Sequence, residues 1–211
     1  MNQRKRSLIT GLLYISLALL GPVALLIIPA QFDVDNVTLF AQDHLWLIGI
    51  WIVLELMIIG IEVILTINLY QMFKAYHKGL SFVASIFRFA VVLIMTVGVI
   101  FLSLILFNQG NGADMWIQNH QTFVYIWQLW FSVHVFILGL MILKNNKTYW
   151  KYLGGALLIG AFGYLLDATR ALTHMDNPIV SSLSTILLIF ITIGEIGMSI
   201  GLIKNKIITL D

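Results

Sequence analysis

The sequence predicts an all-α, polytopic membrane protein in which six transmembrane helices form one bundle. Of its 211 residues, 60% are hydrophobic and only 10% are charged, and the mean hydropathy is +0.95. Soluble domains carry about 25% charged residues, so this composition excludes an ordinary soluble protein. Six apolar runs are long enough to cross about 30 Å of hydrocarbon at about 1.5 Å per residue. They cover residues 8–30, 45–73, 82–107, 122–143, 152–172 and 179–203, within one transmembrane domain that spans 1–211.

The limits of each run follow from the residues around it. The first run follows the basic stretch NQRKR and is longer than the roughly 7 to 15 apolar residues of a signal-peptide core, so we expect a retained helix, interrupted at Pro22. Loops with lysines precede the third and fifth runs, and loops with aspartates and histidines precede the second, fourth and sixth. Every connection is short, which leaves no room for a soluble nucleotide-binding or nucleic-acid-binding domain.

Basic residues predict the orientation of the bundle. Apart from Arg88 and Arg170, every lysine and arginine falls on one side: Arg4, Lys5, Arg6, Lys74, Lys78, Lys144, Lys147, Lys151, Lys204 and Lys206. The acidic loop residues fall on the other side: Asp33, Asp35, Asp43, Asp114 and Asp176. Because basic loops stay in the cytoplasm, we expect both termini there. The net charge of +2 reflects this topology and gives no reason to expect a nucleic-acid partner.

Charged side chains inside the predicted spans are the main functional candidates. They are Glu55, Glu62, Arg88, Asp167 and Glu195. A charge at the bilayer centre costs about 2.5 to 3.5 kcal/mol on insertion scales, so such residues face the interior and find partners. Seven residues turn a helix through nearly two full turns, so the two glutamates of the second helix share a face about 10 Å apart.

Counting depth along each helix sorts the polar residues into two layers. An inner layer near the cytoplasmic side contains Glu62, Arg88, His134 and Glu195, and an outer layer contains Glu55, Gln128 and Asp167. Tyr164 shares a face of the fifth helix with Asp167.

These charges have a structural explanation and a functional one. Asp167 with Arg170, and Glu62 with Arg88, are candidate structural ion pairs. Four buried acids then face one deep arginine and one at the rim, so at least two acids lack a basic partner and must be protonated, hydrated or bound to a cation. Glu55, with no obvious cation, is the better candidate for a protonated or ligand-binding carboxyl, and Glu62 for an anchor or gate.

Histidines and missing motifs narrow the chemistry. His44, His120 and His174 fall on the outer face and are the only candidates for a metal site, but their spacing does not support one, and we expect solvated loop histidines, no metal and no cofactor. The chain has no cysteine, which excludes disulfides and thiolate chemistry. It also lacks H-E-x-x-H and G-x-S-x-G, so no catalytic motif points to an enzyme.

The chain as a whole resembles a known family of membrane proteins. The stretches that carry the likeness are GLLYISLALLGPVALLIIP, LGIWIVLELMIIGIEVILTINLYQMFK, FRFAVVL, LWFSVHVFILGLMIL and YLGGALLIGAFGYLLD. They resemble the bacterial six-helix family catalogued as domain of unknown function 4386.

The resemblance implies a multi-pass protein of the bacterial cytoplasmic membrane and brings no activity with it. It implies polar positions at Glu55, Glu62, Arg88, His134, Tyr164 and Asp167. Glu195 has no counterpart in that pattern, and KNNKTYWKYLGG departs from the family's connection after the fourth helix.

Three hypotheses for function follow. The first is a non-enzymatic module that binds or moves a small solute, proton or cation, with Glu62, Arg88 and His134 as inner gate or coupling residues and Glu55 and Asp167 outside them. The second is an intramembrane enzyme acting on a lipid or isoprenoid head group, with a carboxylate and His134 as acid and base. The third is a membrane scaffold. The expected surroundings are the lipid bilayer, and the sequence leaves the oligomeric state open.

Overall fold

The computed structural model describes residues 2–32, 35–145 and 147–204. Two charged loop residues named above, Asp33 and Lys206, lie outside this part. The helices are α1 (Gln3–Pro22), the π-helix η1 (Val23–Ile27), α2 (Ile28–Ala30), α3 (Val37–Asp43), α4 (Leu45–Phe73), α5 (Lys78–Phe107), α6 (Ala113–Leu143), α7 (Thr148–Leu172) and α8 (Pro178–Ile203). Six helical segments, with α1 to α2 counted as one, are long and apolar enough to span a membrane. The all-α, six-span prediction is therefore confirmed for the described residues.

Helix limits match the sequence in α4 and differ elsewhere. The helices α5, α6 and α7 begin earlier than the apolar runs 82–107, 122–143 and 152–172, because polar residues continue a helix beyond the hydrocarbon. The largest difference is in α6, which begins at Ala113. Gly112 before it adopts φ 67°, a left-handed conformation that suits glycine, and Asp114 lies in the first turn, where a negative charge favours the helix N-terminus.

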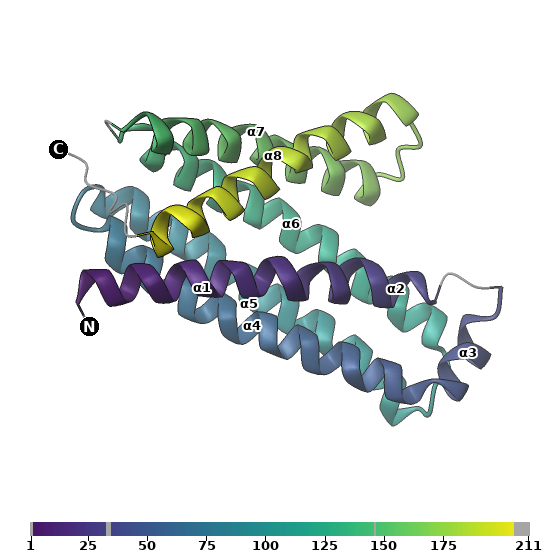
Figure 1. The fold of residues 1–211 in the computed structure, drawn as a ribbon. Helices are drawn as coiled ribbons and strands as arrows, with labels where there is room; N and C mark the ends of the chain where they lie inside the picture. The colour runs from purple at the N-terminus through teal and green to yellow at the C-terminus, as the bar shows by residue number, and fades with distance from the viewer. Residues whose placement is uncertain (1, 33–34, 146, 205–211) are drawn as a thin grey trace.

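The six long segments form a closed ring in chain order. Each of α4, α5, α6, α7 and α8 packs on the helix before it, with α4 on α1, and α8 returns to pack on α1 (Figure 1). The closing contact is close: Ser199 Oγ donates to the Gly11 carbonyl at 2.7 Å and Ser7 Oγ donates to the Leu202 carbonyl at 2.9 Å. A Cβ on Gly11 would come within 2.8 Å of the Ser199 carbonyl oxygen. Away from this contact α8 diverges from α1 (Figure 1).

Both described chain ends lie at the same end of the bundle, called here the terminal end, and the opposite end is called the far end (Figure 1). The described lysines and arginines other than Arg88 and Arg170 lie at the terminal end, in the helix ends and connections that meet there. The charge segregation expected from the sequence is therefore present in the fold.

Glycines bring α7 and α8 together. A Cβ on Gly160 would lie 2.6 Å from the backbone nitrogen of Ile191, and a Cβ on Gly163 would lie 2.9 Å from the backbone of Leu187 and Leu188. Small residues allow this close approach of helices in a membrane. The contact fixes the neighbouring Tyr164 against the ring's interior, where its side chain packs edge-on to Phe131 at 5.4 Å.

Candidate functional site

Arg88 is the centre of the most polar region in the described bundle. Its side chain is fully buried. Nε donates to Glu62 Oε2 at 2.6 Å, and Nη1 donates to both the Tyr14 hydroxyl at 3.1 Å and His134 Nε2 at 2.9 Å. The rings of Tyr14 and Phe131 lie 5.5 and 5.4 Å from Arg88 Cζ, at cation–π distance. Tyr14, Glu62, Arg88 and His134 are called the Arg88 cluster below, and they come from α1, α4, α5 and α6.

Hydrogen bonding fixes the protonation state of His134. Its Nδ1 lies 2.8 Å from the Ala84 carbonyl, which can only accept, so Nδ1 carries a proton. Its Nε2 faces Arg88 Nη1, which can only donate, so Nε2 carries none. His134 is therefore a neutral imidazole with both nitrogens occupied.

One nitrogen of the Arg88 guanidinium group has no hydrogen-bond partner among the described residues. Arg88 Nη2 is buried and makes no hydrogen bond with any described residue. Glu195 on α8 lies within electrostatic range of Arg88 and Glu62, is partly exposed, and forms no hydrogen bond or ion pair within residues 2–32, 35–145 and 147–204. Tyr164 on α7 is within electrostatic range of the same groups. Glu195 is thus the one acid of the inner layer without a direct partner in the described chain.

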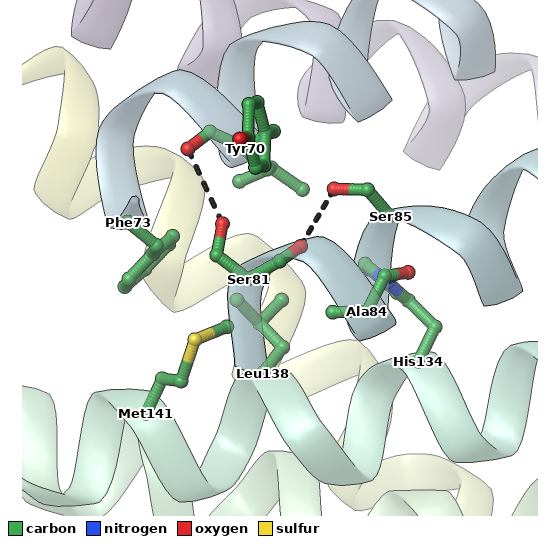
Figure 2. A pocket seen from close by; sticks show the side chains of 9 residues that line it. Tyr70, Phe73, Ser81, Ala84, Ser85, His134, Leu138 and Met141 are labelled. Atoms are coloured by element: carbon green, nitrogen blue, oxygen red, sulfur yellow. Dashed lines mark hydrogen bonds between the residues drawn. The ribbon is translucent and has the colours of Figure 1, made fainter. Parts of the chain in front are cut away.

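A small pocket lies beside the Arg88 cluster toward the terminal end. It is lined by Leu69, Tyr70, Phe73, Ser81, Ala84, Ser85, His134, Leu138 and Met141 (Figure 2). Ser81 Oγ donates to the Tyr70 carbonyl at 3.2 Å, and Ser85 Oγ donates to the Ser81 carbonyl at 2.8 Å, so polar atoms line part of its wall. A cavity needs about 10 to 15 Å³ to hold a water, and this pocket admits about one water molecule.

A second buried acid–base pair lies toward the far end. Glu55 Oε1 of α4 is 3.3 Å from His120 Nε2 of α6, and each residue is about 2% exposed. The edge of the Trp51 ring packs on the His120 ring, with centroids 4.9 Å apart. Neither Glu55 Oε1 nor His120 Nδ1 makes a hydrogen bond among the described residues. These two residues are called the Glu55–His120 pair below.

Large apolar side chains separate the Arg88 cluster from the Glu55–His120 pair. On α4, α5 and α6 the buried residues between the two polar levels include Ile58, Val91, Val92, Met95, Trp127 and Phe131, called here the apolar layer. Gln128 of α6 lies at this level as well, partly exposed, and its Oε1 is buried without a hydrogen-bond partner in the described chain. The two polar levels are therefore separate sites.

The expected outer layer does not form as one group. Asp167 pairs with Arg170 at 3.3 Å within α7, as the sequence predicts, and also accepts a hydrogen bond from Ser184 of α8 at 3.4 Å. Glu55 pairs instead with His120, so the expectation that Glu55 has no basic partner is wrong. Of the four buried acids, Glu195 alone is left without a basic contact in the described residues, rather than two acids as expected.

The three histidines assigned to the outer face have different surroundings. His44 Nδ1 lies 2.9 Å from the Phe40 carbonyl, and its ring stacks on Phe40 at 4.1 Å. His174 is exposed in the turn after α7. The expectation that His120 is a solvated loop residue is wrong, because α6 starts early enough to bury it. No group of three His, Asp or Glu side chains suited to a metal ion occurs in the described ranges.

Sequence reasoning misses Tyr14 and the burial of His120 beside Glu55. Tyr14 lies on the buried face of α1 with Ser7, Thr10 and Gly11, a polar and small stripe at helical spacing that the sequence displays. Hydropathy alone begins the predicted helix at residue 122 and so leaves His120 outside the membrane. The Gly112 turn and the acidic first turn of α6 are signals that locate its true start.

A family model described as a domain of unknown function (DUF4386) matches residues 9–204. The chain belongs to this family. The match runs from α1 to the end of α8, so both polar sites of this DUF4386 protein lie inside it. Neither curated proteins nor solved structures gave a match.

Proposed function

We propose that this DUF4386 protein binds a proton at Glu195, next to the Arg88 cluster, and moves protons across the bacterial cytoplasmic membrane. The observation that carries the proposal is the balance of charge around Arg88. The described residues at this level include two carboxylates, Glu62 and Glu195, and one guanidinium, while His134 is locked in its neutral form. With both acids ionised, the site is one positive charge short.

The missing charge has a physical cost. Glu62 is neutralised by its direct contact with Arg88 Nε, which leaves the Glu195 carboxylate without a contact of its own. A carboxylate deep in a membrane costs several kcal/mol unless it is paired or neutralised. A bound proton removes this cost, and proton relays in membrane proteins are built from such acids. The described residues cover the Glu195 side chain only in part.

The size of the neighbouring pocket favours a proton over an organic solute. The pocket lined by Ser81, Ser85 and His134 reaches the edge of the Arg88 cluster from the terminal end and admits about one water (Figure 2). Water at this place would reach His134 at the edge of the cluster. In the proposed orientation the terminal end, which carries the basic residues, faces the cytoplasm.

Each residue of the cluster then has a distinct role. Arg88 holds Glu62, Tyr14 and His134 together, so Glu62 is the structural anchor and Glu195 is the proton-binding acid. His134 orients the guanidinium and links it to the backbone of α5 through Ala84. None of these roles requires a cofactor.

The enzyme alternative finds less support in this geometry. It needs His134 as an acid or base, and both of its ring nitrogens are committed to Arg88 and Ala84. The scaffold alternative needs small-residue faces open to lipid. Gly49 and Gly60 of α4 have no neighbouring atom within 4 Å of a Cβ position, but a scaffold has no need for an unpaired acid at the bilayer's depth. The charge balance favours proton binding over both.

Proton flux into liposomes tests the proposal. The full chain is reconstituted with a pH-sensitive dye trapped inside, and a potassium gradient with valinomycin supplies the driving potential. We expect proton entry well above that of protein-free liposomes, and a loss of about ten-fold or more in Glu195→Gln. Thr192→Val is the matched control, because Thr192 lies one turn away on α8 and its hydroxyl bonds only within the helix, to the Leu188 carbonyl at 3.3 Å.

Three outcomes contradict the proposal. They are wild-type flux equal to the protein-free background, unchanged flux in Glu195→Gln, and equal losses in Glu195→Gln and Thr192→Val. Glu195→Asp guards against a folding defect, since it keeps a carboxyl and is expected to retain part of the flux. Sodium entry that replaces proton entry would assign the site to a metal cation and overturn the proton proposal.

A further inference from the structure

The Glu55–His120 pair is an incomplete ion pair. Nε2 and Oε1 are 3.3 Å apart, close enough for an ionic contact, yet the Oε1 atom makes no hydrogen bond in the described chain. Nδ1 of His120 and Nε1 of the adjoining Trp51 are also buried without hydrogen-bond partners in that part of the protein. Buried polar atoms are nearly always satisfied, and Glu55 is a buried acid whose one polar contact among the described residues is His120.

The two deep histidines differ in what they can accept. His134 has both nitrogens occupied, one by a donor and one by an acceptor, so it has no free position for another proton. His120 has an acidic partner on one side and an unengaged nitrogen on the other. The geometry therefore leaves His120 free to carry protons on both nitrogens, in the form that pairs best with a carboxylate.

No other described cation competes for Glu55. On α4 the next charged residue is Glu62, two turns away and bound to Arg88. On α7, Asp167 and Arg170 pair with each other. Three more titratable groups lie on or beside the elements that pack on α6 near its start: Asp114 of α6 itself, which accepts from Thr38 at 3.4 Å, Asp43 at the end of α3, and His44 between α3 and α4, whose Nδ1 lies 2.9 Å from the Phe40 carbonyl. From α5, the residue that meets the imidazole is Gly98.

The surroundings of His120 are closely packed. A Cβ on Gly98 would lie 3.3 Å from His120 Cδ2 and 3.7 Å from Nε2, so the α5 backbone borders the imidazole directly. Trp51 covers another side edge-on. A proton is the one ligand that a site like this accepts without displacing atoms.

We propose that the Glu55–His120 pair is a second proton-binding site, on the far-end side of the apolar layer. A hydronium ion or buffer acid gives up one proton, which binds to the imidazole and converts neutral His120 and ionised Glu55, with a joint charge of −1, into an imidazolium–carboxylate pair with no net charge. Within the proposed function, this site receives or releases the proton on the opposite side of the apolar layer from Glu195. The charge state itself does not depend on transport.

Nitrogen NMR of the histidine side chains tests this site. The full chain, with ¹⁵N-labelled histidine, is placed in lipid nanodiscs, and the His120 signal is assigned by its loss in His120→Gln. We expect both His120 ring nitrogens to show the protonated chemical shift at pH 7, and His134 to show one protonated and one unprotonated nitrogen. Glu55→Gln removes the carboxylate and is expected to abolish the imidazolium signal, because a buried cation without a partner is costly.

The control is Asp167→Asn, which neutralises the acid of the partly exposed Asp167–Arg170 pair on α7 and is expected to leave the His120 signal unchanged. A neutral His120 in the wild type at pH 7, or an imidazolium signal that survives in Glu55→Gln, would overturn the inference.

If Glu55→Gln does not fold, Gly98→Ala is measured instead. This change presses a methyl group on the imidazole, so it is expected to shift the His120 signals and leave those of His134 in place. Unshifted His120 signals in Gly98→Ala would also overturn the inference. An imidazolium at His120 together with absent proton flux would contradict the proposed function and leave this site standing.

Discussion

Removing either partner of the Arg88–Glu62 pair is expected to destabilise the protein strongly, and removing both much less. The pair is 2.6 Å long, and the side chains of Arg88 and Glu62 are 0% and 8% exposed. Breaking a buried pair by deleting one partner costs about 3 to 5 kcal/mol, because an uncompensated charge stays buried. We therefore expect Arg88→Met to shift the unfolding equilibrium by about 10² to 10⁴-fold, at about 1.4 kcal/mol per ten-fold.

A double-mutant cycle isolates the interaction between the two side chains. In Arg88→Met, the further change Glu62→Gln removes the stranded carboxylate, so we expect a coupling energy of about 2 to 3 kcal/mol. Unfolding free energies are measured in lipid bicelles by steric trapping, with tags on two introduced cysteines, which the cysteine-free chain permits.

The Asp167–Arg170 pair supplies a matched comparison. Its N–O distance is 3.3 Å, and its arginine and aspartate side chains are 29% and 19% exposed. Partly exposed ion pairs contribute about 1 kcal/mol or less, so the cycle of Asp167→Asn with Arg170→Met is expected to give a coupling below about 1 kcal/mol. Additive effects of the Arg88 and Glu62 changes, or equal coupling in the two cycles, would refute the argument that Arg88 neutralises Glu62.

Three further predictions concern single positions. His134→Leu leaves an N–H of Arg88 and a backbone carbonyl unpaired and is expected to cost about 2 to 4 kcal/mol in unfolding free energy, whereas the amide of His134→Gln satisfies both groups and costs less than about 1.5 kcal/mol. Gly160→Ala places a Cβ 2.6 Å from a backbone nitrogen of α8 and is expected to destabilise by about 1 to 3 kcal/mol, while Gly155→Ala, with open space around it, stays within about 1 kcal/mol of wild type in the same assay. Single cysteines at the exposed positions Lys144 and Asp114 are expected to react with a membrane-impermeant reagent from opposite sides of the cell membrane, Asp114 from outside; the reverse pattern would contradict the proposed orientation.

Much of the fold is predictable because only a few arrangements of a chain can cross a membrane. Apolar length and the placement of lysine and arginine identify six spans and bring both chain ends to one end of the bundle. The contacts of Arg88 with Glu62 and His134 are likewise predictable, because depth along each helix brings these residues to one level. Depth and an intramembrane charge therefore suffice for the centre of the site.

Partners that depend on helix rotation or on helix limits were not predictable in this way. Tyr14 joins the Arg88 cluster because α1 packs against α4, and no charged residue near Tyr14 on α1 indicates that contact. His120 meets Glu55 because α6 continues to Ala113 through residues of low hydropathy. Depth along the helices places Glu55 and Asp167 at the same level. Their positions around the helix axes direct Glu55 toward His120 and Asp167 toward Arg170.

The infrared spectrum of the Glu195 carboxyl group tests the central claim most directly. The claim is that Glu195 binds an exchangeable proton because the Arg88 cluster has one positive charge too few. The difference spectrum between wild type and Glu195→Gln is predicted to contain the carbonyl band of a protonated carboxylic acid at neutral pH, which gives way to carboxylate bands as the pH is raised and returns when it is lowered. Carboxylate bands alone at every pH, or an acid band that never responds to pH, would contradict the account.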